Sequence, residues 1–424
     1  MAARAEEGPA AAPIVTMREI VVMVTSSYPR YPGDGVGSFM EPIAKGVAAL
    51  GHEVHLVAPW HPAITRGREE DGVFFHFFRY APVAALNVFG YASGLRADTD
   101  LRAAAWAVAP IALAAGWFKA WRVATKRRAT MMHGHWVIPS GVMAAAAARS
   151  LPVVISVHGS DVYVAERHAV AGMMARRAFH RAGAVTACSD DLHRRAVTLG
   201  ADPSRTETVP YGVDTRRFAP DPGARTEVRA ALDVGSAPLV FTAGRLVSKK
   251  GFEYLIDAVR ALESSSPGLP GHPPLILAIA GDGDLAASLR ARAAGLPVRF
   301  LGNQSQDAIA RFAAAADVVA VPSIRDDAGN VDGLPNFALE ALASATPVVA
   351  TVAGGLPQAI TDGDNGLLVP ERDAAALAAA IGRLIASPDT ARDLGARARS
   401  RVERDYSWKH TAEMMVAAYA RARG

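Results

Sequence analysis

The feature that most constrains the fold is a regular alternation of short apolar runs with longer helical stretches. Residues 19–25 (EIVVMVT) and 52–58 (HEVHLVA) are typical of buried strands, with a helix expected near 39–50 that ends at Gly51. The same rhythm returns in three further apolar runs, at residues 151–157, 184–188 and 205–209. Strands that alternate with helices predict a parallel, doubly wound α/β sheet.

The rhythm stops once and then restarts. Residues 210–235 are rich in Pro, Asp, Gly and Arg, and a second series of strand-like runs follows, at 238–243, 275–280, 298–301, 318–321 and 347–351. We therefore expect an N-terminal domain over 17–212 and a C-terminal domain over 213–404, with the hinge near 211–225. A final helix, starting near Ser407 within 405–424, is expected to return toward the first domain. Because ligands of open α/β sheets lie beyond the carboxyl ends of the strands, two facing sheets would share one cleft.

Composition sets limits on function. Half of the 424 residues are apolar and a fifth are charged, which is typical of folded globular proteins. The net charge is only +4, from 45 basic and 41 acidic residues, so no nucleic-acid partner is expected. Cys188, expected as a buried thiol, is the only cysteine, which excludes an intrachain disulfide and favours a reducing compartment. The first sixteen residues lack the pattern of a signal peptide, so cytoplasmic action is expected.

One apolar segment raises the question of membrane contact. Residues 103–118 (AAAWAVAPIALAAGWF) are followed by a basic stretch that reaches Arg128. A spanning helix needs about 20 apolar residues, and this run is shorter and contains Pro110, so a transmembrane helix is not expected. A buried helix is the preferred interpretation. The alternative is peripheral contact through 103–128, as a helix at the inner face of the cell membrane.

Two turns that follow strands could hold an anion. In PGDGVGSFMEP, Gly33, Gly35 and Gly37 would let backbone amides approach an anion at the start of a helix, and a turn without a ligand is the alternative. The glycine spacing does not fit a dinucleotide fingerprint. In GRLVSKKG, Arg245 and Lys250 would project a planar fork and a point charge from a strand-to-helix turn, which suits a diphosphate.

A third turn, VDGLPNFALEA, is bracketed by Asp332 and Glu340. The amides that follow Gly333 lie where a helix start attracts negative groups. Glu340 falls inside the apolar run FALEALAS, where a carboxylate is costly unless it has a partner. An ionised carboxylate offers two acceptor oxygens, so Glu340 could bind vicinal hydroxyls, and a capping acid with a surface glutamate is the alternative.

Taken together, the motifs resemble those of a known family. The glycine loop, VHGSD, PYGVDTRRF, GRLVSKKG, AGDGD, FLG, VPS, the acid-x7-acid segment and NGLLVP occur in the order and spacing of the large retaining glycosyltransferase family with the GT-B fold. The match runs from residue 19 to about 408 and is similar to family 4 enzymes of exopolysaccharide and glycoconjugate biosynthesis. It implies two Rossmann-like domains that face each other across a cleft.

The resemblance implies roles for residues of the second domain. Arg245 and Lys250 match the basic pair that grips the donor diphosphate and stabilises the departing phosphate, and Glu340 matches the acid that holds the nucleotide ribose. Asp332 stands near the transferred sugar where the family usually has glutamate, and its side chain is one methylene shorter. The donor-binding set is completed by backbone positions in three loops: Gly35, Gly37, Gly283, Gly333, Leu334, Pro335 and Asn336.

In the first domain, His158 of VHGSD ends a strand and matches the histidine that faces the sugar. His135 of HGHWVIPSG could line the acceptor side of the cleft or support the next loop. Asp161 could orient His158 or cap the following helix.

The implied reaction replaces the nucleoside diphosphate by a hydroxyl of a glycan or lipid-linked glycan, with retention and by a front-face route. No cofactor and no essential metal are expected, since AGDGD, with Asp282 and Asp284, matches a nucleotide-base loop rather than a metal motif. A nucleotide-sugar 2-epimerase and a non-catalytic nucleotide-sugar-binding protein remain alternatives. The identities of the nucleotide, the sugar and the acceptor stay open.

Overall fold

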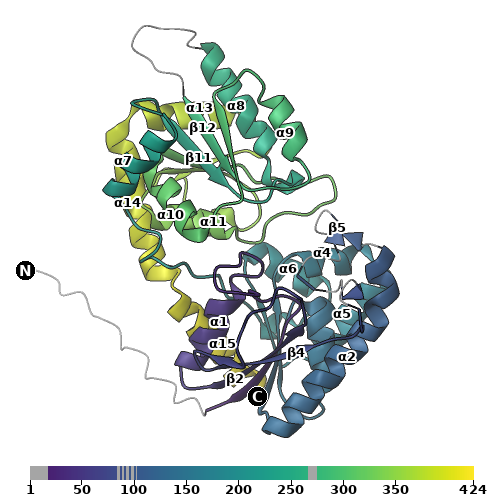
Figure 1. The fold of residues 1–424 in the computed structure, drawn as a ribbon. Helices are drawn as coiled ribbons and strands as arrows, with labels where there is room; N and C mark the ends of the chain where they lie inside the picture. Colours follow the sequence, from purple (N-terminus) through teal and green to yellow (C-terminus); the bar gives the residue numbers. More distant parts are fainter. Residues whose placement is uncertain are drawn as a thin grey trace, which may run out of the picture.

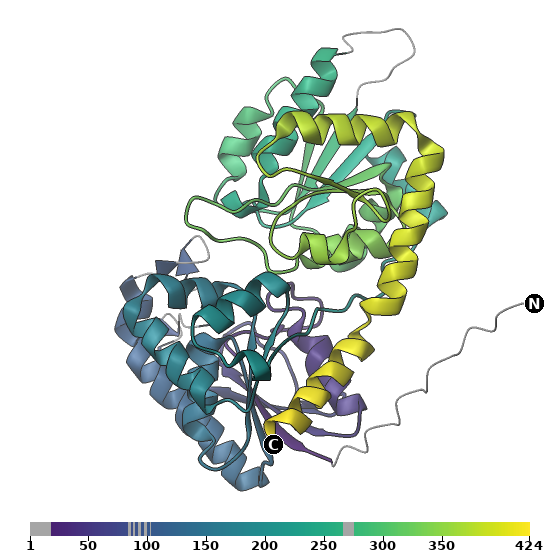
Figure 2. The same cartoon turned by 180° about the vertical axis from the view of Figure 1, so that it is seen from behind.

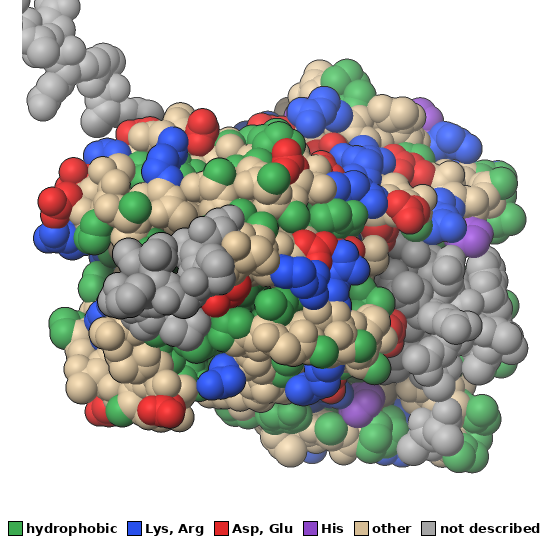
Figure 3. All heavy atoms as spheres, turned by 90° about the horizontal axis from the view of Figure 1, so that it is seen from above, with side chains coloured by type: hydrophobic (Ala, Val, Ile, Leu, Met, Phe, Trp, Pro, Cys, Tyr) green, Lys and Arg blue, Asp and Glu red, His purple; other side chains and the backbone are tan. Residues whose placement is uncertain are grey.

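A computed structural model of the chain describes residues 18–83, 86–87, 90–91, 95–96, 100–101, 103–265 and 275–424. Figure 1 shows two α/β domains, each a largely parallel sheet between layers of helices. The expected pair of doubly wound sheets is confirmed. On the face seen in Figure 3, Lys and Arg side chains are interspersed with Asp and Glu.

The sheet of the first domain has the strand order β10-β9-β8-β7-β1-β2-β4-β3 within the described residues. Neighbouring strands run parallel except β3, which pairs antiparallel with β4. The strands are β1 (Ile20–Val24), β2 (Glu53–Pro59), β3 (Glu69–Glu70), β4 (Val73–Phe78), β7 (Met131–His135), β8 (Val153–Val157), β9 (Ala184–Ala187) and β10 (Thr206–Thr208), with a separate pair, β5 (Leu95–Arg96) and β6 (Asp100–Leu101).

The helices of this domain carry their apolar residues at helical spacing. In α1 (Met40–Ala49), Met40, Ile43, Ala44 and Val47 are buried, which is one face of a helix. Gly51 follows with a φ of +92°, the left-handed conformation that commonly ends a helix. The other helices are α2 (Ala103–Arg127), α3 (Val142–Ala147), α4 (Ser160–Arg167), α5 (Ala169–Arg181) and α6 (Asp190–Thr198).

The sheet of the second domain has the order β13-β12-β11-β14-β15-β16, and all its pairs are parallel. Its strands are β11 (Leu239–Ala243), β12 (Ile276–Ala280), β13 (Val298–Gly302), β14 (Val318–Val321), β15 (Val348–Thr351) and β16 (Leu367–Val369). Its helices are α7 (Pro222–Ala231), α8 (Phe252–Ser265), α9 (Ala286–Arg292), α10 (Gln306–Ala315), α11 (Asn336–Ala343), α12 (Leu356–Ala359), α13 (Ala374–Ala386) and α14 (Pro388–Asp405).

Six of the described strands were not expected from the sequence: the two-residue strands β3, β5 and β6, and the longer β4, β7 and β16. β7 (MMHGH) has no β-branched residue and carries two histidines, so it lacks the composition of a buried strand. It is nevertheless buried throughout, between β1 and β8, and the ring nitrogens of its His133 meet Ser156 and Tyr419 (2.7 and 2.9 Å). Such long-range partners are invisible in local sequence.

The chain crosses between the domains twice, side by side. Val213 bridges to Ser407, and its amide donates to the Tyr406 carbonyl (2.9 Å). Gly212 lies against this second crossing so closely that a Cβ there would be 2.3 Å from the Trp408 amide nitrogen. The two crossings therefore form a paired hinge.

The last helix, α15 (Trp408–Ala422), leaves the second domain and packs on the first, against α1, β8 and β9 (Figure 2). Ser407 caps it by accepting from the His410 amide (3.1 Å). A Cβ at Gly46 of α1 would lie 2.7 Å from the Ala412 Cβ, so the two helices are in direct contact. Met415 and Tyr419 of α15 are buried in the core of the first domain.

Helix α2 is buried on one side only. Ala112, Ala120 and Ala124 are buried, and the helix packs on α3 and on the sheet. Trp117 and Phe118 are 42% and 48% exposed. In the part of the chain that the structure describes, no helix combines the length and apolarity that crossing a membrane requires.

Candidate functional site

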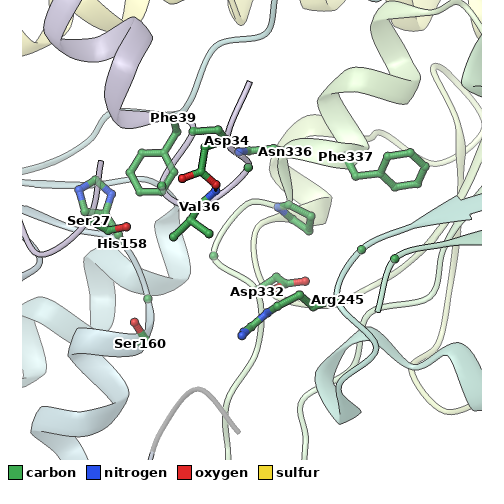
Figure 4. A pocket seen from close by; sticks show the side chains of 18 of the residues that line it. Ser27, Asp34, Val36, Phe39, His158, Ser160, Arg245, Asp332, Asn336 and Phe337 are labelled. Carbon is green, nitrogen blue, oxygen red and sulfur yellow. The ribbon is translucent and has the colours of Figure 1, made fainter. Parts of the chain in front are cut away.

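A cavity of about 1200 Å³ lies between the two domains. Its walls are loops that follow β1, β7 and β8 in the first domain and β11, β12 and β14 in the second, as expected at the carboxyl ends of parallel strands. Figure 4 shows Asp34, Phe39 and His158 on one side of this space and Arg245 and Asp332 on the other.

The glycine loop after β1 contributes an open stretch of backbone. Gly33 and Gly37 have φ values of +86° and +67°, and a Cβ at Gly35 would meet nothing within 4 Å. Asp34 shapes the loop by accepting from the amides of Arg30 (3.0 Å) and Val36 (3.2 Å). Backbone near Gly35 can therefore be approached closely by a ligand.

His158 follows β8 and is partly exposed to the cavity. Its Nδ1 lies 2.6 Å from the Tyr211 hydroxyl, and its Nε2 lies 3.1 Å from Nδ1 of His135. Burial, with a smaller contribution from His133, lowers the pKa of His158 to about 3, so the ring is neutral. Both ring nitrogens thus face protein partners.

His135 lies behind His158, is fully buried and does not line the cavity. Its Nε2 has no hydrogen-bond partner among the described residues. This position agrees with a supporting role for His135 rather than a place on the acceptor side of the cleft, because its ring contacts His158 from within the core.

Asp161 is 2% exposed and clamps two loops together. Its carboxylate accepts from the backbone amides of Val137 (2.7 Å), Gly159 (2.9 Å) and His158 (3.2 Å). Burial raises the pKa of Asp161 to about 6, against the opposing effect of these amides. It contacts His158 through the backbone amide, so it fixes the loop rather than the imidazole ring.

The opposite wall concentrates positive charge. Nζ of Lys250 and of Lys249 lie 2.7 and 3.3 Å from the two carboxylate oxygens of Asp332. Burial alone would raise the pKa of Asp332, but the two lysines hold it well below its usual range. Arg245 extends into the same space (Figure 4), and desolvation lowers its pKa against the effects of Asp332 and Asp284.

The loop at 281–285 is pinned on the loop that carries Arg245. Leu246 donates to the Asp282 carbonyl (3.0 Å) and accepts from the Leu285 amide (2.9 Å). A Cβ at Gly283 would lie 2.6 Å from the Leu246 carbonyl oxygen, so only glycine fits there. Gly283 lines the cavity at this contact.

The start of α11 points at the cavity. Gly333, Leu334, Pro335 and Asn336 all line it, and Pro335 precedes the helix without a side-chain cap. A Cβ at Gly333 would come within 2.7 Å of Leu192 in the first domain, so this loop also touches the other half of the molecule. The uncapped first turn of α11 offers backbone donors to an anion.

Glu340 lies one turn into α11, is 9% exposed and lines the cavity. Burial raises its pKa to about 7, opposed by a hydrogen bond to Gln306 and by the charges of Arg217 and Lys250. Hydroxyl donors from a ligand would stabilise the ionised form of such a buried carboxyl group.

The cavity residues that sequence reasoning missed include Phe39, Trp136, Tyr211 and Lys249. Lys249 is adjacent to Lys250 in SKK. Tyr211 lies in PYGVD, a motif from which only the position of the hinge was predicted. Proximity of each to a recognised motif was the available signal. No group of three or more His, Cys, Asp and Glu side chains suited to a metal occurs in the described ranges.

Two family models match most of the chain. The model of the glycosyl transferase 4-like domain matches residues 34–212, and that of glycosyl transferases group 1 matches residues 225–401. The two matches meet near the paired hinge.

Curated relatives carry related names. The chain is 34% identical over 262 residues to a GDP-mannose-dependent alpha-(1-6)-phosphatidylinositol monomannoside mannosyltransferase of Mycolicibacterium smegmatis, covering 61% of this chain and 67% of the relative. It is 38% identical over 234 residues to a D-inositol 3-phosphate glycosyltransferase of Actinosynnema mirum, covering 53% of each. The chain thus matches about half to two thirds of the length of these relatives.

Solved structures share the fold. HepE of Anabaena in complex with UDP has a TM-score of 0.74 at 19% identity, covering 95% of this chain and 99% of that one. Sucrose-phosphate synthase of Thermosynechococcus elongatus has a TM-score of 0.75 at 22% identity, covering 95% and 98%.

Proposed function

Because the chain belongs to the GT-B glycosyltransferases of the family 4 type, we propose that it transfers a sugar from a nucleoside diphosphate donor to an acceptor hydroxyl, with retention. The observation that carries the proposal is the convergence of Arg245, Lys250 and the uncapped start of α11 on one cavity wall. Fixed cations and oriented amides stabilise the charge that develops on a departing diphosphate.

In this proposal the donor lies along the second domain. Its diphosphate meets Arg245, Lys250 and the amides at 333–336, and its ribose hydroxyls donate to Glu340. The base lies toward the 281–285 loop, and the sugar extends toward Asp332 and His158. Asp332 pairs with Lys249 and Lys250, so its main role in this proposal is to position those two cations.

The proposed step breaks the bond between the anomeric carbon and the phosphate oxygen and forms a bond to the acceptor oxygen on the same face. The acceptor proton passes to the leaving phosphate, whose charge Arg245 and Lys250 stabilise. His158, held neutral with both ring nitrogens engaged, is not required as a base. A trapped glycosyl-enzyme adduct would overturn this front-face route.

The experiment is a thermal-shift panel with UDP-glucose, UDP-N-acetylglucosamine and GDP-mannose, followed by product analysis. The donor that binds raises the unfolding temperature by mass action, and its transfer product should keep the anomeric configuration. We expect activity to persist in EDTA, because Arg245 and Lys250 would supply the positive charge that the departing diphosphate needs. An inverted product, or no shift with any nucleotide sugar, would contradict the proposal.

The names of the relatives do not favour the two alternatives. An epimerised nucleotide sugar formed without acceptor would restore the 2-epimerase. The protein would instead be a non-catalytic nucleotide-sugar-binding protein if it bound the donor but showed neither sugar transfer nor slow donor hydrolysis, and if Lys250→Ala changed donor binding only.

We further propose that the acceptor is a glycan or lipid-linked glycan and that α2 meets an anionic membrane surface from the cytoplasmic side. Trp117 and Phe118 of α2 are exposed, and Arg122 and Lys126 follow them on the same helix. Apolar side chains beside basic ones suit a helix lying at a lipid interface. Co-sedimentation with phosphatidylglycerol vesicles should fall when both basic residues become glutamine, and unchanged binding would refute the contact.

A further inference from the structure

Four aromatic rings in contact with one another form part of the first-domain wall of the cavity. Phe39 stacks on Tyr211 (centroids 4.6 Å apart) and contacts His158 (4.8 Å), and Trp136 contacts His158 (4.8 Å). All four line the cavity. The polar atoms of His158 are engaged within the protein, since its Nδ1 contacts the Tyr211 hydroxyl and its Nε2 contacts His135. This wall therefore offers ring faces.

Trp136 is the one member of this wall with a strained backbone. Its φ of +66° and ψ of +112° lie outside the regions that bulky residues ordinarily adopt. Hydrogen bonds fix it on both sides, from its amide to the Ser156 carbonyl (2.8 Å) and from the Gly141 amide to its carbonyl (2.9 Å). The next amide, of Val137, donates to the buried carboxylate of Asp161 (2.7 Å).

Backbone strain persists where the surroundings over-determine it, and such residues cluster at ligand sites. Here the strain places a large aromatic side chain, only partly buried, on the wall of a cavity. The opposite wall carries Arg245, Lys249 and Lys250. The wall with these cations thus suits anionic groups, and the aromatic part of the first-domain wall suits an uncharged ring with an apolar C–H face.

We propose that Trp136 packs against the sugar or cyclitol ring of the acceptor and is a specificity-determining residue for acceptor choice. This inference rests on the proposed transferase function, which assigns the charged wall to the donor diphosphate. Aromatic faces bind rings through apolar contact area. The Asp161 clamp holds Trp136 in place, so the platform exists before the acceptor arrives.

The test compares Trp136→Leu and Trp136→Phe with the wild type. The donor is the one identified by thermal shift, and methyl α-D-mannopyranoside and myo-inositol serve as acceptor probes. Trp60→Leu is the matched control, because Trp60 packs on Arg79 (3.5 Å from the guanidinium carbon to the ring centroid) and does not line the cavity. Unfolding temperatures show whether each variant folds.

For Trp136→Leu we expect the KM of the better probe to rise about tenfold or more, with donor KM and donor hydrolysis without acceptor within about twofold of wild type. The phenylalanine variant, which keeps a ring, should lie in between, and Trp60→Leu should change neither KM. An acceptor KM within twofold of wild type in both Trp136 variants would overturn the inference. A parallel rise of donor KM would also overturn it, by assigning the ring contact to the donor sugar.

Direct binding keeps this inference separable from the proposed function. Calorimetric titration of methyl α-D-mannopyranoside, with UDP or GDP present, should give weaker binding to Trp136→Leu than to wild type even if no transfer is detected. Wild-type protein that binds the probe but never turns over a donor would refute the transferase. Equal probe binding by wild type and variant, or none by either, would refute the platform.

Discussion

Replacing Glu340 by glutamine is expected to stabilise the protein relative to wild type at pH 8 and much less at pH 5. The ordinary pKa of a glutamate is 4.5, and burial raises that of Glu340 to about 7. Between these values the folded protein holds a proton that the unfolded chain has released, so wild-type stability falls as pH rises through this window. It is highest below pH 4.5, and the loss is complete above about 7.

The magnitude follows from the two pKa values. A difference of about 2.5 units corresponds to about 3.4 kcal/mol in total, and about 2.5 kcal/mol of it develops between pH 5 and pH 8. Glutamine does not titrate, so the variant should lack this slope. Urea unfolding at pH 5, 6.5 and 8, followed by circular dichroism, gives the difference in the free energy of unfolding between variant and wild type.

A difference that stays constant within about 0.5 kcal/mol across this range would refute the reasoning, because Glu340 would then not titrate differently in the folded state. Gln306→Ala is the companion variant. It removes the hydrogen bond that favours the ionised carboxylate, so the slope should extend above pH 7. Donor should bind Glu340→Gln more weakly than wild type even where the variant is more stable, because stability and ligand binding are opposed at such a site.

Three further predictions concern other parts of the site. Arg245→Ala and Lys250→Ala should each lower the rate of sugar transfer at saturating donor by about 10²- to 10³-fold, measured in single turnovers, and a tenfold loss or less would remove them from phosphate stabilisation. Gly37→Ala, at a φ of +67°, should lower the free energy of unfolding by about 1 kcal/mol or more, whereas Gly35→Ala, in open space, should not. Asp161→Ala should cost about 3 kcal/mol or more in urea unfolding, since three amides lose their acceptor.

The architecture could be predicted from local sequence because parallel α/β folds repeat a local pattern of strands and helices. Runs such as EIVVMVT are buried on both faces of a sheet, so they are continuously apolar and easily recognised. Ser407, a good helix cap, marked the start of the last helix within one residue. The match of whole motifs to a family then identified Arg245, just beyond the end of β11, and Glu340, within α11, and the structure brings both to one cavity.

Contacts between distant residues were beyond this reasoning. Nothing local to MMHGH reveals that His133 meets Tyr419, 286 residues away. Asp332 was expected near the sugar, and its pairing with Lys249 and Lys250 depends on how β11 and β14 lie side by side. Asp332, which stands where the family usually has glutamate, thus pairs with two lysines that only the three-dimensional fold brings close to it.

Helix α15 has a consequence for how the protein is made. The first domain is synthesised first, yet the layer over α1, β8 and β9 is supplied by residues that leave the ribosome about 200 residues later. Until then the partners of Met415 and Tyr419 have no cover, and His133 has no hydroxyl to bond. The half translated first is therefore the half whose core closes last, and a nascent chain stalled within the second domain would present this uncovered surface to chaperones and proteases.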